Sequence, residues 1–305
     1  MDENAQKDLT IVTVPWNSRE VLVQNLETLF QSTGDVSFDV VAVDNASHDG
    51  SADLVRERFP QVHVIANVDN RGFSAACNQG IALSKSRHVL LLNPDMRVTL
   101  DALQKTVAYL DAHPEVGVMG AKLIGSDGKT IPHIRRFPTF WDQLATLLKL
   151  PHFFPHLLDR YLGTDLDLDK EQFVDSVRGS YFAINQTALE RLGGLDERYF
   201  IWFEEVDYCK QVCAAGLKVA YVPSIIAHDL VGRSFAQRDS YWKQKNFTRS
   251  MVTYFKKWHP WWQGKTLAAA RTLILSVAWV LSFPSLRRRG QGRSRPRVPP
   301  LAPPS

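Results

Sequence analysis

The chain has 305 residues, of which 45% are apolar and 22% charged, so it can bury one large core, or one core with a small appendage. The formal net charge is only +4, and six arginines between Arg287 and Arg297 form a basic tail without acids. The remainder is therefore near neutral or slightly acidic, which argues against nucleic acid as the main ligand.

The three cysteines, Cys77, Cys209 and Cys213, have no metal-binding spacing, and their odd number does not suit a disulfide framework. This usage indicates a reducing compartment. Residues 1–8 are polar and acidic, without the apolar segment of a secretion signal. We therefore expect the folded part of the chain to face the cytoplasm.

Apolar strand patterns alternate with helical patterns through the first 112 residues. The spacing of apolar residues predicts strands over 9–14, 38–43, 62–66 and 88–92, and helices over 18–31, 51–59, 74–84 and 100–112. Strands that alternate with helices through short polar turns are typical of βαβ units. The predicted fold class is α/β with a mainly parallel sheet.

The pattern weakens over 117–175. This stretch contains the aromatic and proline-rich run 137–141 and an apolar run, 147–158, that Pro151 and Pro155 interrupt. Such a sequence is poor β-sheet material. It suits core helices or a mobile apolar flap over a lipid-like substrate, and core packing is favoured because buried apolar segments are common. Acceptor contacts are expected within 125–175.

Residues 236–284 are predicted to form a helical extension that associates with a membrane. The run 266–283 is apolar except for Arg271, whereas a bilayer crossing needs about 20 apolar residues and a buried arginine is costly. Flanking tryptophans and arginines favour a tilted or interfacial helix. Residues 285–305 are predicted to be a disordered tail. Peripheral or monotopic attachment to the cytoplasmic face of the inner membrane follows.

The apolar segment 88–92 ends on Asn93-Pro94-Asp95. Pro94 cannot donate to the ladder, so the chain must leave the sheet there. Because ligands bind at the carboxyl edge of open α/β sheets, Asp95 is a candidate metal or phosphate-side ligand. The alternative is an ordinary Asn-Pro-Asp turn. His228 follows another apolar strand and is either a core histidine or a nitrogen ligand that acts with Asp95.

Two other turns carry candidate ligand contacts. Asp44 ends the second strand and could hydrogen-bond a nucleotide base or ribose, whereas Ser47 or Asp49 is explained by capping of the next helix. Gly72 allows close backbone approach before helix 74–84, and Arg71 with the helix amides suits a diphosphate. A plain turn and cap would explain the same residues.

An acidic pair follows an aromatic run later in the chain. Residues 200–203 are expected to be buried, which would carry Glu204 and Glu205 to the rim of the core, where burial raises the pKa of a carboxyl group. A general base is made in this way. The alternative is an acidic first turn of a helix over 206–215, ended by Gly216.

Six motifs, taken in order, resemble the family 2 inverting glycosyltransferases of the GT-A fold, and most of all the rhamnosyltransferase-like branch. The resemblance covers residues 9–235 and implies a donor half over about 9–115 and an acceptor half over about 116–235 of a domain spanning 1–235. The motifs are Thr13-Val14-Pro15-Trp16-Asn17, the run 43–51, the run 70–80, Leu91-Leu92-Asn93-Pro94-Asp95, Gly193-Gly194-Leu195-Asp196-Glu197 and Glu204-Glu205-Val206-Asp207.

The resemblance implies a nucleotide-diphosphate sugar donor, with dTDP-rhamnose favoured, a lipid- or polysaccharide-linked acceptor, and Mg²⁺ or Mn²⁺ as cofactor. Asp95 would hold the metal, with His228 as a further metal or diphosphate contact. Glu205 matches the general base of the family, with Glu204 as the alternative. The donor-binding residues would be Pro15, Asn17, Asp44, Asn45, Arg71, Gly72, Phe73, Asn78, Asn93 and Gly179.

Two other functions are alternatives to sugar transfer. A sugar nucleotidyltransferase would need a glycine-rich basic loop after the first strand, and residues 14–18 are not such a loop. A non-catalytic, membrane-docked scaffold would release no nucleoside diphosphate from any activated sugar. The motifs favour an inverting, metal-dependent sugar transferase in cell-envelope glycan synthesis.

Overall fold

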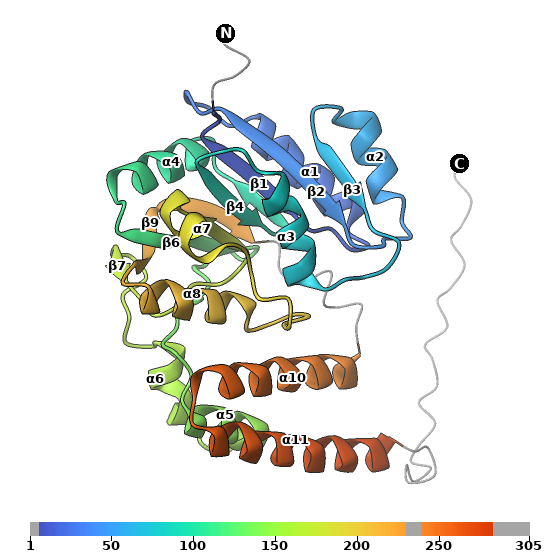
Figure 1. The fold of residues 1–305 in the computed structure, drawn as a ribbon, viewed down its shortest axis with the longest axis vertical. Coiled ribbons are helices and arrows are strands. Elements are labelled where there is room, and N and C mark those ends of the chain that lie inside the picture. Colours follow the sequence, from blue (N-terminus) through green and yellow to red (C-terminus); the bar gives the residue numbers. More distant parts are fainter. Residues whose placement is uncertain (1–5, 230–238, 283–305) are drawn as a thin grey trace, which may run out of the picture.

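The computed structural model describes residues 6–229 and 239–282 and shows an α/β domain above a layer of helices (Figure 1). The elements expected over residues 9–112 are confirmed, with ends that differ by at most two residues. They are β1 (Leu9–Thr13), α1 (Arg19–Phe30), β2 (Phe38–Asp44), α2 (Ser51–Arg58), β3 (His63–Ala66), α3 (Phe73–Leu83), β4 (His88–Leu92) and α4 (Ala102–Ala112).

A short strand, β5 (Met96–Val98), lies between β4 and α4, and the second half of the chain adds strands and helices in a less regular order. These are β6 (Val116–Gly125), α5 (Phe140–Leu147), the 3-10 turns η1 (Leu150–His152) and η2 (Pro155–Leu158), α6 (Asp159–Leu162), β7 (Gln172–Phe173), β8 (Tyr181–Ile184), α7 (Gln186–Leu192), α8 (Glu204–Ala214), β9 (Lys218–Asp229), α10 (Ser240–Trp258) and α11 (Trp261–Ser282).

The strands form one mixed sheet in the order β3-β2-β1-β4-β8-β6-β9-β5, with β7 paired to β9. The strands of the first half, β1 to β4, pair in parallel, so β1, β2 and β4 end at the same edge. β8 runs antiparallel between β4 and β6. As a result, the residues just before β8 lie beside the residues just after β4.

The stretch after residue 117 was expected to be poor β-sheet material. This prediction was wrong for β6, a ten-residue strand inside the sheet. Glycine is normally depleted in strands, yet β6 contains Gly117, Gly120 and Gly125. A Cβ atom at Gly120 would lie 2.8 Å from the Cβ of Val177, so the close approach of the segment that carries Val177 requires a glycine here. Close packing therefore favours glycine over the usual strand residues, and for this reason the sequence of β6 does not have a recognisable strand pattern.

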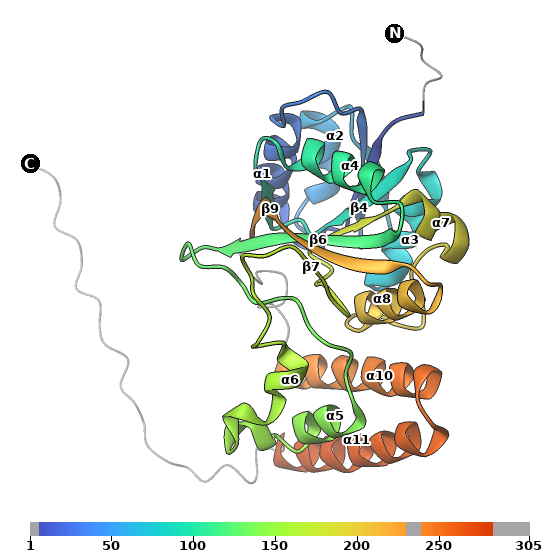
Figure 2. The same ribbon diagram turned by 90° about the vertical axis from the view of Figure 1, so that its left-hand side faces the viewer.

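The helical layer is built from α5, α10 and α11 (Figures 1 and 2). These helices share an apolar cluster with the segment before α8, and the cluster includes Phe140, Tyr199, Phe203, Phe255 and Leu267. Core packing is therefore confirmed for α5. It is wrong for the turns that follow, because Leu148, Phe153, Phe154 and Leu157 are exposed.

The helical extension expected over 236–284 corresponds to α10 and α11. Within the described ranges, no helix combines the length and the apolarity that a bilayer crossing requires. The domain boundary expected at residue 235 and the tail expected over 285–305 lie outside the described residues.

Candidate active site

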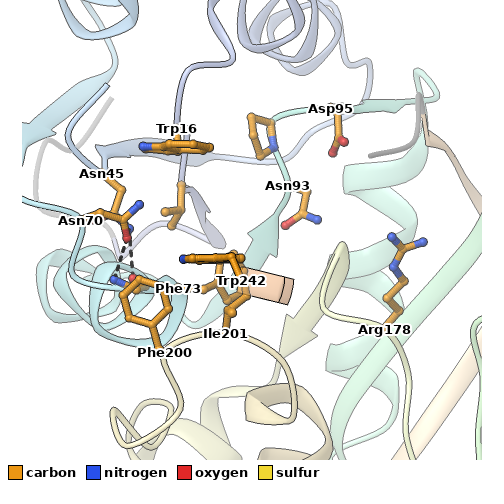
Figure 3. Close-up of a pocket in the computed structure, with 13 residues that line it drawn as sticks. Trp16, Asn45, Asn70, Phe73, Asn93, Asp95, Arg178, Phe200, Ile201 and Trp242 are labelled. Carbon is orange, nitrogen blue, oxygen red and sulfur yellow. Dashed lines mark hydrogen bonds between the residues drawn. The ribbon is translucent and has the colours of Figure 1, made fainter. Parts of the chain in front are cut away.

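The carboxyl ends of β1, β2 and β4 open into a first pocket (Figure 3). Trp16 lies across the opening from Phe200 and Trp242, whereas Asp95 and Arg178 lie at the other end. The pocket therefore has an aromatic end and a charged end. Its lining comprises Val14, Trp16, Asn45, Asn70, Gly72, Phe73, Asn93, Pro94, Asp95, Arg178, Phe200, Ile201 and Trp242.

The Asn45 side chain shapes the loop at the aromatic end. Its Nδ2 donates to the Gly72 carbonyl and to the Asn70 Oδ1, each at 3.1 Å, and its Oδ1 accepts from the Arg71 backbone N–H at 3.0 Å. Asn45 is nearly buried, so these bonds fix the loop against the end of β2. The loop is thereby held ready for a ligand.

Gly72 is required by two features of its position. Its φ angle is +86°, which side chains rarely adopt, and a Cβ atom there would lie 2.6 Å from the Phe200 carbonyl oxygen. The same carbonyl accepts from the Phe73 backbone N–H at 2.7 Å. The first turn of α3 and the aromatic segment before α8 thus meet at the wall of the pocket.

The charged end is assembled by strand pairing. Because β8 runs antiparallel to β4, the Asn93 backbone N–H donates to the Ser180 carbonyl at 3.0 Å. Arg178 Nη1 donates to Asp229 Oδ2 at 3.1 Å, and Asp229 pairs with Met96 in the β5–β9 ladder. These pairings bring Arg178 to the turn that carries Asn93 and Asp95.

Several residues expected at a donor site lie just behind the pocket. Asp44 is buried and accepts from the Ser47 hydroxyl, and burial raises the pKa of this carboxyl group. Asn17 Oδ1 accepts from the His48 backbone N–H at 2.8 Å. The Pro15 carbonyl accepts from the Asn45 N–H at 2.9 Å. These residues support the wall and do not line it.

Four other expected residues are not among the described lining residues of the first pocket: Asn78, Arg71, His228 and Gly179. The Asn78 side chain exchanges two 2.8 Å hydrogen bonds with the Leu195 backbone, which ties α3 to the turn before α8. Arg71 is exposed, and its backbone N–H donates to the Asn45 side chain in the pocket wall. His228 is exposed on β9, whereas the next residue, Asp229, is buried against Arg178.

A second pocket, of about 470 Å³, shares Arg178 with the first and contains Glu205. Glu205 lies in the first turn of α8, and a Cβ atom at Gly179 would lie 3.6 Å from its Cβ. The lining comprises Ile131, Pro132, His133, Arg135, Tyr161, Ser176, Val177, Arg178, Trp202, Phe203, Glu205, Val206 and Phe247. Its volume is within the usual range for small-molecule sites.

The two carboxyl groups of the acidic pair have different surroundings. Burial raises the pKa of Glu205, while nearby Arg135 and Arg178 favour its charged form. Burial and the neighbouring Glu205 raise the pKa of Glu204 well above its usual range. Glu204 lines neither pocket, and its Oε2 has no hydrogen-bond partner in the described part of the chain. Of the two acids, Glu205 is therefore the one that lines a pocket.

The expectation that residues 200–203 are buried holds only for Phe203. Phe200 and Ile201 line the first pocket and Trp202 lines the second. Trp202 and Phe203 have φ angles of 65° and 69°, so the chain turns sharply before α8. This turn brings Phe200 to the first pocket and Trp202 to the second.

The residues of the first pocket that were not predicted as site residues include Trp16, Asn70, Arg178 and Trp242. Trp16 and Asn70 stand inside recognised motifs, and Arg178 directly precedes Gly179, so these three could have been found. Trp242 comes from α10, and no sequence pattern links that helix to β1.

Comparison with known proteins identifies the family. The model of glycosyl transferase family 2 matches residues 10–172, more than half of the chain. The chain belongs to this family. A relative from Mycobacterium tuberculosis, N-acetylglucosaminyl-diphospho-decaprenol L-rhamnosyltransferase, is 26% identical over 229 residues, which are 71% of this chain and 74% of the relative. Rhamnosyltransferase WbbL from Escherichia coli is 24% identical over 195 residues, 59% of this chain and 70% of its own.

Solved structures that resemble this family 2 glycosyltransferase have the same GT-A fold. The mannosyltransferase PcManGT from Pyrobaculum calidifontis, solved with GDP-Man and Mn²⁺, has a TM-score of 0.55 at 18% identity, covering 92% of this chain and 81% of its own. Staphylococcus aureus TarS, residues 1–349, has a TM-score of 0.53 at 13% identity, covering 92% and 75%. The fold expected from the sequence is confirmed.

Proposed function

We propose that this family 2 glycosyltransferase moves a sugar, with rhamnose favoured, from a nucleotide-diphosphate donor to a lipid- or glycan-linked acceptor in cell-envelope glycan synthesis, with inversion. One observation carries the proposal: Arg178 is the common wall of a pocket that contains Asp95 and a pocket that contains Glu205. A donor and an acceptor held in these pockets would meet beside Arg178. The rhamnosyltransferase relatives support this choice of sugar and acceptor class.

The first pocket suits a nucleotide-diphosphate sugar. Its aromatic end offers Trp16 and Trp242 as surfaces for a nucleobase, because bases stack on aromatic side chains. Its charged end offers the guanidinium of Arg178 to phosphate oxygens. The donor therefore lies with its base between the tryptophans and its diphosphate toward Asp95.

The chemistry of the charged end fits a divalent cation. Asp95 supplies a carboxylate and Asn93 an amide oxygen, and such hard oxygen ligands suit Mg²⁺ or Mn²⁺ together with substrate phosphates and water. No group of three or more His, Cys, Asp or Glu side chains in the described residues forms a self-sufficient metal site. When bound, the cation would neutralise negative charge on the leaving diphosphate.

Glu205 is the proposed general base. It takes the proton from an acceptor hydroxyl while that oxygen forms a bond to the anomeric carbon, and the bond from that carbon to the diphosphate oxygen breaks on the opposite face. The electron pair leaves with the nucleoside diphosphate, and the configuration inverts. Arg178 stabilises charge on the side of the leaving group.

A donor panel tests the proposal. Purified protein is incubated with dTDP-rhamnose, UDP-sugars and GDP-sugars, with Mg²⁺ or Mn²⁺ and a diphosphate-linked acceptor, and nucleoside diphosphate release is measured. We expect release with one donor class that stops when the metal is chelated. If every donor fails both to bind and to react, the proposal is wrong and the scaffold function gains support.

A further inference from the structure

The second pocket contains two positively charged side chains. Arg135 and Arg178 both line it, and both favour the charged form of Glu205. Arg178 is paired with Asp229, and the proposed function assigns it to the donor diphosphate of the first pocket. Arg135, in contrast, makes no ion pair with any residue of 6–229 or 239–282, and its guanidinium lies 5.7 Å from the centre of the Tyr161 ring. One guanidinium therefore remains available to a ligand.

We propose that Arg135 binds a phosphate or diphosphate group of the acceptor in the second pocket. This inference rests on the proposed function. A guanidinium presents a planar fork of donors that matches phosphate oxygens. Trp202 and Phe247 add aromatic surface to the same pocket, which suits the apolar face of a sugar or the start of a lipid chain. The acceptor is thus anchored by its phosphate while its sugar hydroxyl reaches Glu205.

The test measures binding, so it does not depend on turnover. The probes are N-acetylglucosaminyl-diphosphoryl-citronellol and the neutral citronellyl N-acetylglucosaminide, titrated calorimetrically into the full chain. We expect the diphosphate probe to bind at least about tenfold more tightly, and Arg135→Gln to abolish this difference. The matched control is Arg136→Gln, because Arg136 is the neighbouring arginine but pairs with Asp165 at 2.6 Å outside the pocket.

Equal affinity for the two probes, or equal effects of Arg135→Gln and Arg136→Gln, would overturn the assignment. Nucleoside diphosphate binding is measured in the same variants and is expected to be unchanged. If the diphosphate probe binds through Arg135 but no donor yields transfer, the proposed function fails while this site stands.

A second feature, independent of the pockets, is an exposed apolar surface on the helical layer. Phe153 is 77% exposed and Phe154 is 61% exposed, in the turns that follow α5. Trp261 of α11 is 70% exposed. We define the basal surface by all exposed large apolar residues of these segments: Trp141, Leu148, Phe153, Phe154, Leu157, Trp261, Trp262 and Leu273.

The basal surface joins two segments that are far apart in the sequence. Phe140 contacts the Trp262 ring, with centroids 5.2 Å apart, and its neighbour Trp141 at 5.1 Å. Figures 1 and 2 both show α5 and α11 together, at the end of the molecule opposite the N-terminal strands. A planar partner could therefore touch both segments at once.

The charge distribution identifies the partner. Residues 240–282 contain seven lysines and arginines and no aspartate or glutamate. On α11, the Lys265 ammonium lies 4.6 Å from the centre of the Trp261 ring. Exposed aromatic residues beside cations are typical of surfaces that rest in the headgroup region of anionic membranes. We infer that the basal surface binds an anionic lipid bilayer.

The experiment compares the full chain with Phe153→Ser/Phe154→Ser in co-sedimentation with vesicles of phosphatidylcholine containing about one third phosphatidylglycerol. We expect the parent to bind and the double variant to lose most of this binding. The control is Phe173→Ser, since Phe173 is 54% exposed but lies on β7, and it should bind like the parent.

Unchanged binding of the double variant, or no binding by the parent, would overturn the inference. Light scattering without vesicles tests whether a second copy of the chain binds the basal surface instead. If the parent is a dimer and the double variant a monomer, the basal surface is an interface between two copies and the membrane assignment is wrong.

Discussion

The Lys257 ammonium lies 2.7 Å from the Asp207 carboxylate and joins α10 to α8, the helix that carries Glu205. Asp207 is fully buried and also accepts hydrogen bonds from Trp258 Nε1 at 2.6 Å and from the Tyr199 hydroxyl at 3.1 Å. The last acid of the motif at 204–207 is thus a structural anchor. It holds the helical layer against α8, which carries the proposed general base.

Removal of either partner of this pair should destabilise the fold. We expect Asp207→Asn or Lys257→Met to lower the free energy of unfolding by about 2–4 kcal/mol, because the first removes the buried charge that Lys257 and Trp258 bind and the second leaves that charge without its cation. Urea denaturation measures the change. The control pair is Glu27 and Arg58, which is exposed at the surface, and Arg58→Met should cost less than about 1 kcal/mol. Similar losses for both pairs would contradict the anchor role.

The acidic pair should divide sharply between catalysis and structure. We expect Glu205→Gln to reduce the rate of sugar transfer by about 10²–10⁴ without loss of donor binding, since an amide cannot take the acceptor proton. Glu204→Gln, the matched variant one residue away, should retain most of the activity because Glu204 lines neither pocket. The reverse result would assign the base to Glu204.

The first half of the fold could be predicted because its strands and helices have regular apolar spacing and end in recognisable turns. The centre of the site could not. Arg178 reaches Asn93 only because β8 inserts antiparallel beside β4, and β8 is a four-residue strand without a periodic signal. Trp242 lies across the pocket from Trp16 because α10 docks there. Long-range pairing of this kind leaves no trace in local spacing.

The metal assignment can be tested with two residues that were expected to bind the metal, one that lines the first pocket and one that does not. Asp95→Asn should weaken donor binding in the presence of Mn²⁺ at least about tenfold, because Asp95 supplies the carboxylate among the described lining residues of the first pocket. His228→Ala should have little effect, since this side chain is exposed on β9. Calorimetric titration with and without chelator measures both. A large effect of His228→Ala would restore the role that the family resemblance implied.

The two tryptophans at the aromatic end should contribute to nucleotide affinity. We expect Trp16→Ala or Trp242→Ala to cost about 1–3 kcal/mol in binding of the nucleoside diphosphate, the usual contribution of base stacking on an aromatic side chain. Trp141→Ala is the control, because Trp141 is exposed outside the pocket. Equal affinity in all three variants would show that the base binds elsewhere.

Glu204 should also make stability depend on pH. Its pKa is raised in the folded state, so folding favours the protonated form, and the stabilisation is complete below the usual carboxyl pKa and is lost as pH rises toward the raised pKa. The parent should therefore unfold at progressively lower temperature as pH increases over that window. Glu204→Gln cannot ionise, so its melting temperature should fall less over the same window, while the remaining fall reports Glu205, whose pKa is raised in the same direction. Thermal melts of both proteins across this range measure the difference, and parallel curves would show that Glu204 is ionised alike in the folded and unfolded chains.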